Sequence, residues 1–349
     1  MKKKLLWAGV DLGVETASVC IINDAGEAVH EGCCPASARD VRNQLVKFRK
    51  RRFASVAIEA GTGTQVARGL RSLGYPVELY ESRQLSKFLR INRNKTDAGD
   101  AKGLAEAGRV GASLVSKVYL KSLESQAILS CLTIRRHLIR QRMASVSVLE
   151  RQIELFGGKL RFTIEDRGIA SAAEKQIRKY LTTGQHPTAE LRYLITHCAR
   201  LITHQKELDR ELTRIAEQNE VCRRFMEIPG VGAISALAFF AAIDDPHRFT
   251  RLSDVGSYFG LAPRMHESGV TVRKSRISKM GNKNVRSLLV SAAGKHLRYC
   301  GSDSALRSWT KAIEQRSGRL PSRVALGRKL AIIMLAMWKR GEHFHPRTV

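Results

Sequence analysis

The stretch from Leu123 to Leu155 contains neither proline nor glycine, and its apolar residues recur at helical spacing. Gly157-Gly158 follows directly and predicts the end of that helix. A second long helix is predicted after a polar region that contains Gly184 and Pro187. The middle of the chain is therefore expected to be an antiparallel pair of long helices.

The second of these helices carries a heptad pattern of one polar and six apolar positions, spaced alternately by four and three residues. Its members are Leu194, Cys198, Leu201, Gln205, Leu208, Leu212 and Ile215. This seam can pack against the other long helix of the same chain, or against a second copy. The sequence supports both alternatives equally.

The first part of the chain has a different pattern, in which short apolar runs are separated by turns and amphipathic stretches. Three successive strands followed by alternating helix and strand is the order of a ribonuclease-H-like α/β fold. Strands are predicted at Leu5–Val10, Ala17–Ile22, Glu27–Glu31, Ser55–Ile58 and Pro76–Tyr80, and helices around 39–50, 64–73 and 97–109. After Glu227, further helices are predicted around 234–242, 283–299 and 321–339.

The net charge of the chain indicates which class of partner it binds. The 349 residues include 60 Lys and Arg against 32 Asp and Glu, a net charge of +28. Such a surplus favours a polyanionic partner, above all nucleic acid, over the alternatives of a ribosome-like or membrane-surface protein. The seven cysteines form no CxxC pair, which is typical of reduced thiols in the cytoplasm. No apolar run is as long as a membrane span, so we expect no membrane association.

Four carboxylates form the first candidate site. Asp11 and Glu59 follow the first and fourth predicted strands, which are neighbours in a ribonuclease-H-like sheet, and Asp97 and Asp100 share one face of a helix start. Carboxylate oxygens are ligands for Mg²⁺, and two ions roughly 4 Å apart can clamp a phosphodiester. The alternative is that these acids cap helices or pair with basic residues.

Basic and glycine-containing segments are the candidate nucleic-acid contacts. Arg93 and Lys95 precede Asp97 and can meet an arriving phosphate, or belong to a solvated loop. Gly230 and Gly232, in the segment 228–232 before an apolar helix, allow backbone N–H groups to approach a phosphate, as in helix-hairpin-helix binding. A plain tight turn requires the same glycines.

Ser268 is the candidate nucleophile, since it precedes a glycine in an expected loop within a strongly basic region. Between 262 and 300 the only acid is Glu267, whereas the cations are Arg264, Arg273, Lys274, Arg276, Lys279, Lys283, Arg286, Lys295 and Arg298. Such a field suits a phosphate backbone and stabilises the charge that develops when a serine attacks phosphorus. The alternative is that Ser268 is part of an ordinary turn.

Taken together, these motifs resemble the DEDD transposases of bacterial insertion sequences, the insertion sequence 110 family, with Piv-type DNA invertases as relatives. The resemblance covers nearly the whole chain. It lies in the segments 9–11, 58–60, 93–97 with 100–101, 228–232, 260–264, 267–269 and 278–282 with Arg286. It implies a RuvC-like metal-binding domain at 1–118, a helical coiled-coil region at 119–221 and a mostly helical transposase domain at 222–349.

The resemblance also implies roles. Asp11, Glu59, Asp97 and Asp100 would be the Mg²⁺ ligands, and Ser268 would form a covalent phosphoserine with DNA. A structured non-coding guide RNA, the bridge RNA, would pair with donor and target double-stranded DNA. Because two duplexes exchange strands, we expect a homo-oligomer, a dimer or tetramer, acting at the bacterial nucleoid.

Two alternatives remain at this point. One is a RuvC-like, Mg²⁺-dependent nuclease that hydrolyses branched DNA with water, in which Ser268 is structural. The other is a non-catalytic nucleic-acid-binding protein, in which the four acids lie on the surface as helix caps.

Overall fold

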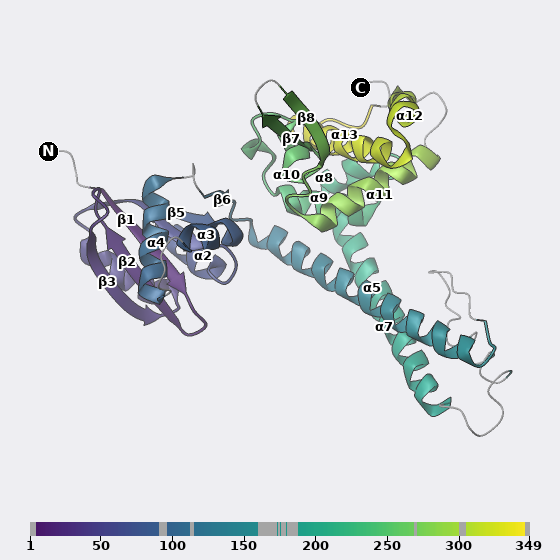
Figure 1. Ribbon diagram of the computed structural model, residues 1–349, viewed down its shortest axis with the longest axis horizontal. Helices are drawn as coiled ribbons and strands as arrows, with labels where there is room; N and C mark the ends of the chain where they lie inside the picture. The colour runs from purple at the N-terminus through teal and green to yellow at the C-terminus, as the bar shows by residue number, and fades with distance from the viewer. Residues whose placement is uncertain are drawn as a thin grey trace. The chain divides into compact units, whose positions relative to one another are not determined.

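The computed structural model describes residues 5–90, 96–111, 115–159, 173, 175, 179, 188–268, 271–299 and 305–345. They form two compact units, Met1–Lys121 and Ser122–Val349, which are described separately below (Figure 1). The described helices include none that is long and apolar enough to cross a membrane.

The first unit is built on a mixed six-stranded sheet with the strand order β3-β2-β1-β4-β5-β6. β1 pairs antiparallel with β2 and parallel with β4. The adjacency of the first and fourth strands is therefore confirmed. The strands are β1 Leu5–Leu12, β2 Thr16–Ile22, β3 Ala28–Pro35, β4 Arg52–Glu59, β5 Val77–Tyr80 and β6 Lys117–Val118.

Helices cover both faces of this sheet, because side chains alternate along each strand and both sets are apolar. Leu6, Ala8 and Val10 of β1 share one core with residues of α1 and α2. On the other face, Trp7 packs with residues of α4, which crosses the sheet in Figure 1. The helices are α1 Ala38–Leu45, the 3₁₀ turn η1 Val46–Phe48, α2 Thr64–Ser72, α3 Ser82–Leu89 and α4 Asp97–Val110.

The second unit contains the two predicted long helices, α5 Leu123–Leu155 and α7 Thr188–Gln218. They run antiparallel. Ile128 and Leu132 share a core with Leu212 and Ala216, whereas at the far end Leu149, Ile153, Leu191, Ile195 and Cys198 form another. Between the two cores, Arg142 donates to the side chain of Gln205 over 2.7 Å.

The heptad seam is buried within this chain. Leu201 is 6 % exposed and Gln205 is 9 % exposed, while Cys198 and Leu212 are fully buried. Of the two alternatives that the sequence left open, the seam therefore packs against α5 of the same chain. The homo-oligomer stays a prediction, and another surface would have to form it.

The C-terminal helices share one apolar core with the first turns of α5 and the last turns of α7. At its centre lies α9, whose sequence is apolar on every side, as expected of a buried helix. The division into middle and C-terminal domains thus stays a prediction. The elements are α8 Glu220–Met226, α9 Ala233–Ile243, η2 Pro246–Arg248, α10 Asp254–Tyr258, β7 Pro263–Ser268, β8 Thr271–Ile277, α11 Lys283–Tyr299, α12 Ala305–Ser317 and α13 Arg319–Arg340.

Candidate active site

Asp11 and Glu59 lie at the carboxyl ends of two adjacent parallel strands. The last paired residues of these strands are Val10 and Ile58, and each is followed directly by the acid. Because side chains alternate, Asp11 shares a face with Gly9, and Glu59 shares a face with Ala57. Both are the faces that contact α4. The fold therefore places the two acids side by side beneath that helix.

The helix that carries Asp97 and Asp100 reaches the same edge of the sheet. A Cβ at Gly9 would lie 2.0 Å from the carbonyl oxygen of Ala101, so β1 and α4 touch backbone to backbone. At the opposite end of α4, Arg109 donates to the carbonyl of Asp24 over 3.4 Å, in the turn between β2 and β3. The start of α4 consequently lies toward the carboxyl ends of β1 and β4.

The start of α4 is built to tolerate negative charge. Thr96 caps the helix, and its hydroxyl accepts from the backbone N–H of Gly99 at 3.0 Å. Asp97 and Asp100 stand in the first turn, where the helix dipole favours anions. Sequence patterning and capping thus explain why the helix begins at this point.

The side chains do not themselves form a closed ligand set. Among the described residues, no three His, Cys, Asp or Glu side chains are arranged to hold a metal ion. Asp11, Glu59 and Asp100 are half-buried, and Asp97 is exposed. Their chemistry nevertheless fits Mg²⁺, since all four supply hard carboxylate oxygens. The structure brings the three carrying elements together and leaves the ligand assignment a prediction.

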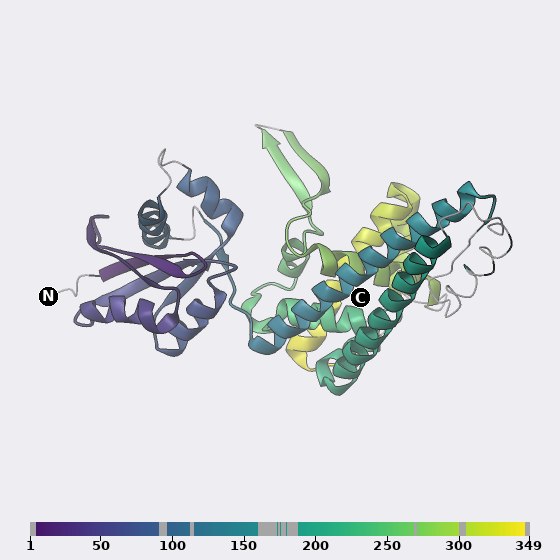
Figure 2. The same cartoon turned by 90° about the horizontal axis from the view of Figure 1, so that it is seen from below.

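Ser268 lies in the second unit, and the expectation that it belongs to a loop is wrong. It is the last residue of β7 and pairs with Thr271 of β8. Figure 2 shows this hairpin (light green) projecting from the helices of its unit. The side chains of 265–275, including those of Ser268, Arg273 and Lys274, lie outside the described residues, as do Arg93 and Lys95.

The described basic residues around the hairpin have different roles. Arg286 donates to the carbonyls of Phe259 at 2.9 Å and Met280 at 3.3 Å, and burial lowers its pKa. These bonds tie two loops together, which is a structural task. Arg264 donates to the carbonyl of Ser278 at 3.0 Å and remains exposed. Arg276 and Lys279 are exposed as well.

The two glycines of the turn between α8 and α9 are not equivalent. Gly230 has φ +92°, and a Cβ there would lie 2.4 Å from the backbone nitrogen of His296 on α11, so packing requires glycine. The buried ring of His296 donates from Nδ1 to the carbonyl of Pro229 at 2.8 Å. Gly232 is exposed at the start of α9, with open space around it. Phosphate contact there stays a prediction.

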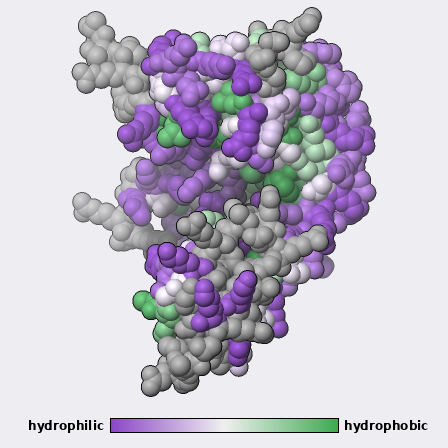
Figure 3. Space-filling view, turned by 90° about the vertical axis from the view of Figure 1, so that its right-hand side faces the viewer, coloured by the Kyte–Doolittle hydropathy of each residue, from purple (hydrophilic) through white to green (hydrophobic). Residues whose placement is uncertain are grey.

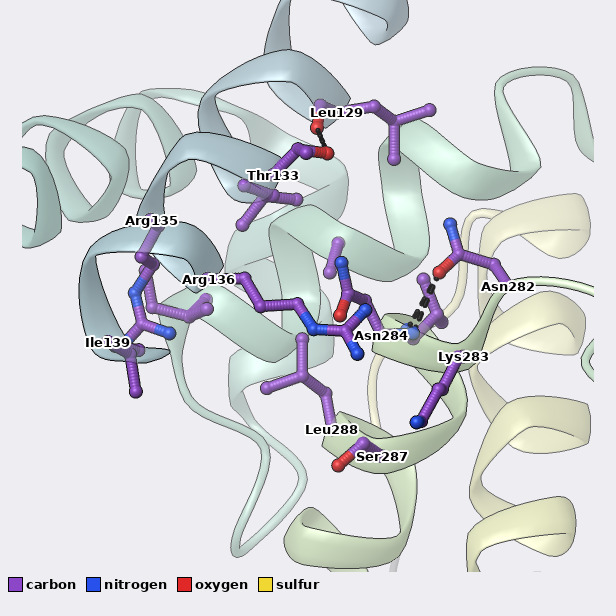
Figure 4. A pocket seen from close by; sticks show the side chains of 14 residues that line it. Leu129, Thr133, Arg135, Arg136, Ile139, Asn282, Lys283, Asn284, Ser287 and Leu288 are labelled. Carbon is purple, nitrogen blue, oxygen red and sulfur yellow. Dashed lines mark hydrogen bonds between the residues drawn. The ribbon is translucent and has the colours of Figure 1, made fainter. Parts of the chain in front are cut away.

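A basic pocket of about 240 Å³ lies between α5, α9 and the first turn of α11 (Figure 4). Arg136 extends from α5 toward Asn284, with Lys283 and Ser287 on the same side of α11. None of the residues that line it is acidic. A phosphate group fits these donors. Arg136 was not among the predicted contacts, although the pair Arg135-Arg136 within the long helix is a usable sequence signal.

Figure 3 shows one face of the molecule, on which the coloured side chains are mostly hydrophilic and the apolar ones occur in small groups.

Two family profiles and several known proteins match this sequence. A family profile described as "Transposase" matches residues 8–156, and one described as "Transposase IS116/IS110/IS902 family" matches 222–307. The transposase for insertion sequence element IS1111A of Coxiella burnetii is 29 % identical over 96 % of this chain and 90 % of its own length. A probable family 20 transposase of Pseudomonas aeruginosa is 30 % identical over 87 % of this chain and 91 % of its own length.

A pilin gene-inverting protein of Moraxella bovis is also similar, with 31 % identity over 44 % of this chain and 48 % of its own. The similarity thus extends from transposases to a protein named for inverting a gene. The two profiles match the sheet unit with α5 and the segment from α8 to the start of α12. The chain therefore belongs to the IS110 family of transposases, which are DNA recombination enzymes.

Proposed function

We propose that this transposase cuts and rejoins DNA by combining the four carboxylates of its first unit with Ser268 of its second. The observation that carries the proposal is the meeting of β1, β4 and the start of α4 at one edge of the sheet. That arrangement supports a RuvC-like unit in which Asp11, Glu59, Asp97 and Asp100 hold Mg²⁺. When bound, Mg²⁺ would polarise the scissile phosphate.

Ser268 would carry out the covalent step. Its Oγ attacks phosphorus, the bond from phosphorus to the 3′-oxygen breaks, and the serine proton ends on the released 3′-hydroxyl. A 3′-hydroxyl of the other duplex then attacks the phosphoserine, which restores the serine and exchanges the strands. Because the phosphodiester energy is conserved in the covalent bond, no nucleotide cofactor is needed.

Exposed cations would hold the backbone during both steps. Arg264, Arg276 and Lys279 lie at the foot of the hairpin that carries Ser268, and Gly232 opens a helix N-terminus. The net charge of +28 is large enough to serve RNA as well as DNA. We infer a structured guide RNA that pairs with donor and target, and a dimer or tetramer acting at the nucleoid.

The experiment traps the covalent species on a nicked suicide substrate in Mg²⁺, digests it with protease and maps the modified peptide by mass spectrometry. We expect an adduct on Ser268 that Ser268→Ala abolishes without weakening DNA binding. Ser275→Ala, a change in the partner strand of the same hairpin, is the matched control and should keep the adduct.

The carboxylates are tested in the same assay. Asp11→Asn, Glu59→Gln, Asp97→Asn and Asp100→Asn should each reduce adduct formation sharply while DNA binding persists. An adduct on Ser275 or Ser278 would overturn the assignment of the nucleophile. DNA cleavage with no adduct on any residue would favour a water-using nuclease of the RuvC type.

A further inference from the structure

A groove of about 910 Å³ in the second unit includes Arg276 and Lys279, which the proposed function places on the DNA backbone, but its apolar lining has no part in the proposed chemistry. One wall is the foot of the β7–β8 hairpin, with Pro263 and Ile277, and the other is formed by Trp309 of α12 and by Leu320 and Val324 of α13. Trp309 is 39 % exposed and Leu320 is 72 % exposed. Apolar side chains that remain exposed around a concave surface indicate a ligand site.

Cations surround this apolar groove. Arg276, Lys279, Arg328 and Lys329 contribute to its lining, which includes no acidic residue. The Nε of Arg328 is buried and finds no hydrogen-bond partner among the described residues. An apolar groove with an exposed indole and surrounding cations complements a nucleobase and its phosphate backbone. The base can stack on the indole of Trp309 while the phosphates contact the cations.

The hairpin that carries the candidate nucleophile also forms one wall of the groove. Pro263 lines the groove and Ser268 ends the strand that begins there, five residues later. At about 3.3 Å per residue, the strand separates the two by about 17 Å. A DNA strand with about 3.4 Å between stacked nucleotides covers that distance in about five steps.

We propose that this groove binds an unpaired base of the DNA strand whose phosphate is attacked by Ser268, about five nucleotides from that phosphate. The inference rests on the proposed function for its register but not for the stacking itself. Trp309 supplies the stacking face, and Lys279 and Lys329 hold the neighbouring phosphates. An unpaired base fits because only an unstacked base presents its face to an indole.

The test uses the full-length protein in Mg²⁺-free buffer and measures anisotropy of a fluorescein-labelled single-stranded DNA 20-mer. A second probe of the same length carries abasic sites at every position. We expect Trp309→Ala to raise the Kd for the intact DNA about tenfold and to leave the Kd for the abasic DNA unchanged. Trp309→Phe should stay within about threefold, since a phenyl ring also stacks.

Tyr193→Ala is the matched control, because Tyr193 is 77 % exposed on α7 and does not line the groove. It should bind both probes like the wild type. Equal losses for intact and abasic DNA with Trp309→Ala would overturn the proposal, as would no loss. A Trp309 effect on an RNA 20-mer alone would overturn the assignment to DNA.

The remaining occupant to exclude is a second copy of the chain. If Trp309→Ala lowers the mass seen by light scattering without nucleic acid, the groove is a protein interface and the proposal fails. Because binding is measured without Mg²⁺ and can be repeated with Ser268→Ala, the result does not depend on phosphoserine chemistry. Failure to trap an adduct would count against the proposed function only.

Discussion

Gly9→Ala tests whether backbone contact between β1 and α4 sets the geometry of the carboxylates. The added Cβ would lie 2.0 Å from the oxygen of Ala101 and 2.3 Å from the nitrogen of Ala105. Ordinary van der Waals contact begins near 3.4 Å, so the two backbones would have to separate by about 1.4 Å to accommodate the methyl group. Neither opposing atom belongs to a side chain that could rotate away, and α4 must therefore move outward.

The expected costs follow from that displacement. Overpacking of this kind typically costs about 1–3 kcal/mol, and for a unit of this size each kcal/mol lowers the Tm by roughly 4 °C. A shift of roughly 1 Å in a catalytic group lowers the rate by about a hundredfold. Under the proposed function, Gly9→Ala should therefore lower the rate of Mg²⁺-dependent strand exchange by about a hundredfold, although alanine is chemically inert.

Gly108→Ala is the matched control within the same helix–sheet contact. Its Cβ would meet the hydroxyl of Ser55 at 3.1 Å and the Cβ of Ala57 at 3.4 Å, which small adjustments relieve. Alanine also favours the helix by about 1 kcal/mol over glycine. Thermal melts by circular dichroism and strand-exchange assays compare the two. Wild-type exchange by Gly9→Ala, with an unchanged Tm, would refute the close contact of β1 with α4.

Three further predictions concern the second unit. Gln205→Leu should cost about 1–3 kcal/mol in urea unfolding because it leaves buried Arg142 without that acceptor, and Arg142→Met in the same chain should recover most of the loss. Burial lowers the pKa of His296 in the folded protein, so below the usual pKa of histidine the unfolded chain binds a proton that the folded chain does not. The free energy of unfolding should therefore fall as the pH drops below about 6.5, and His296→Gln should flatten that dependence; equal slopes would contradict it. Leu201→Glu should lower the Tm of the α5–α7 pair without changing the mass in light scattering, whereas a halved mass would make the seam an assembly surface.

Sequence patterns located the elements that have strong local signals. The bounds of α11 agree with the predicted 283–299, and the predicted end of the first long helix near Gly157 is confirmed, because periodicity and glycine are read locally. The five predicted strands are present, although β1 continues through Asp11 to Leu12. The acids at the sheet edge could be predicted because two strand ends and one helix start are local features.

Strands and pockets that form between segments far apart in the sequence could not be predicted. β7 and β8 are polar strands without a clear alternation, and only their pairing with each other defines them. The two-residue strand β6 was missed for the same reason. The short helix α3 was missed as well, although its cap Glu81 and its amphipathic sequence are local signals. The basic pocket joins Arg136 of α5 to Lys283 of α11, which helix packing alone brings together. A heptad pattern likewise does not say which helix will cover it.

The polar pair in the middle of α5 and α7 has a mechanical consequence. Sliding one helix by a heptad would shift it by about 10 Å and leave the guanidinium of Arg142 among apolar side chains. The two helices are thereby locked in one register and act as a strut of constant length. From Leu132 to Ile153 that strut spans about 32 Å. The far end of the two helices is therefore held at a fixed distance from the C-terminal core.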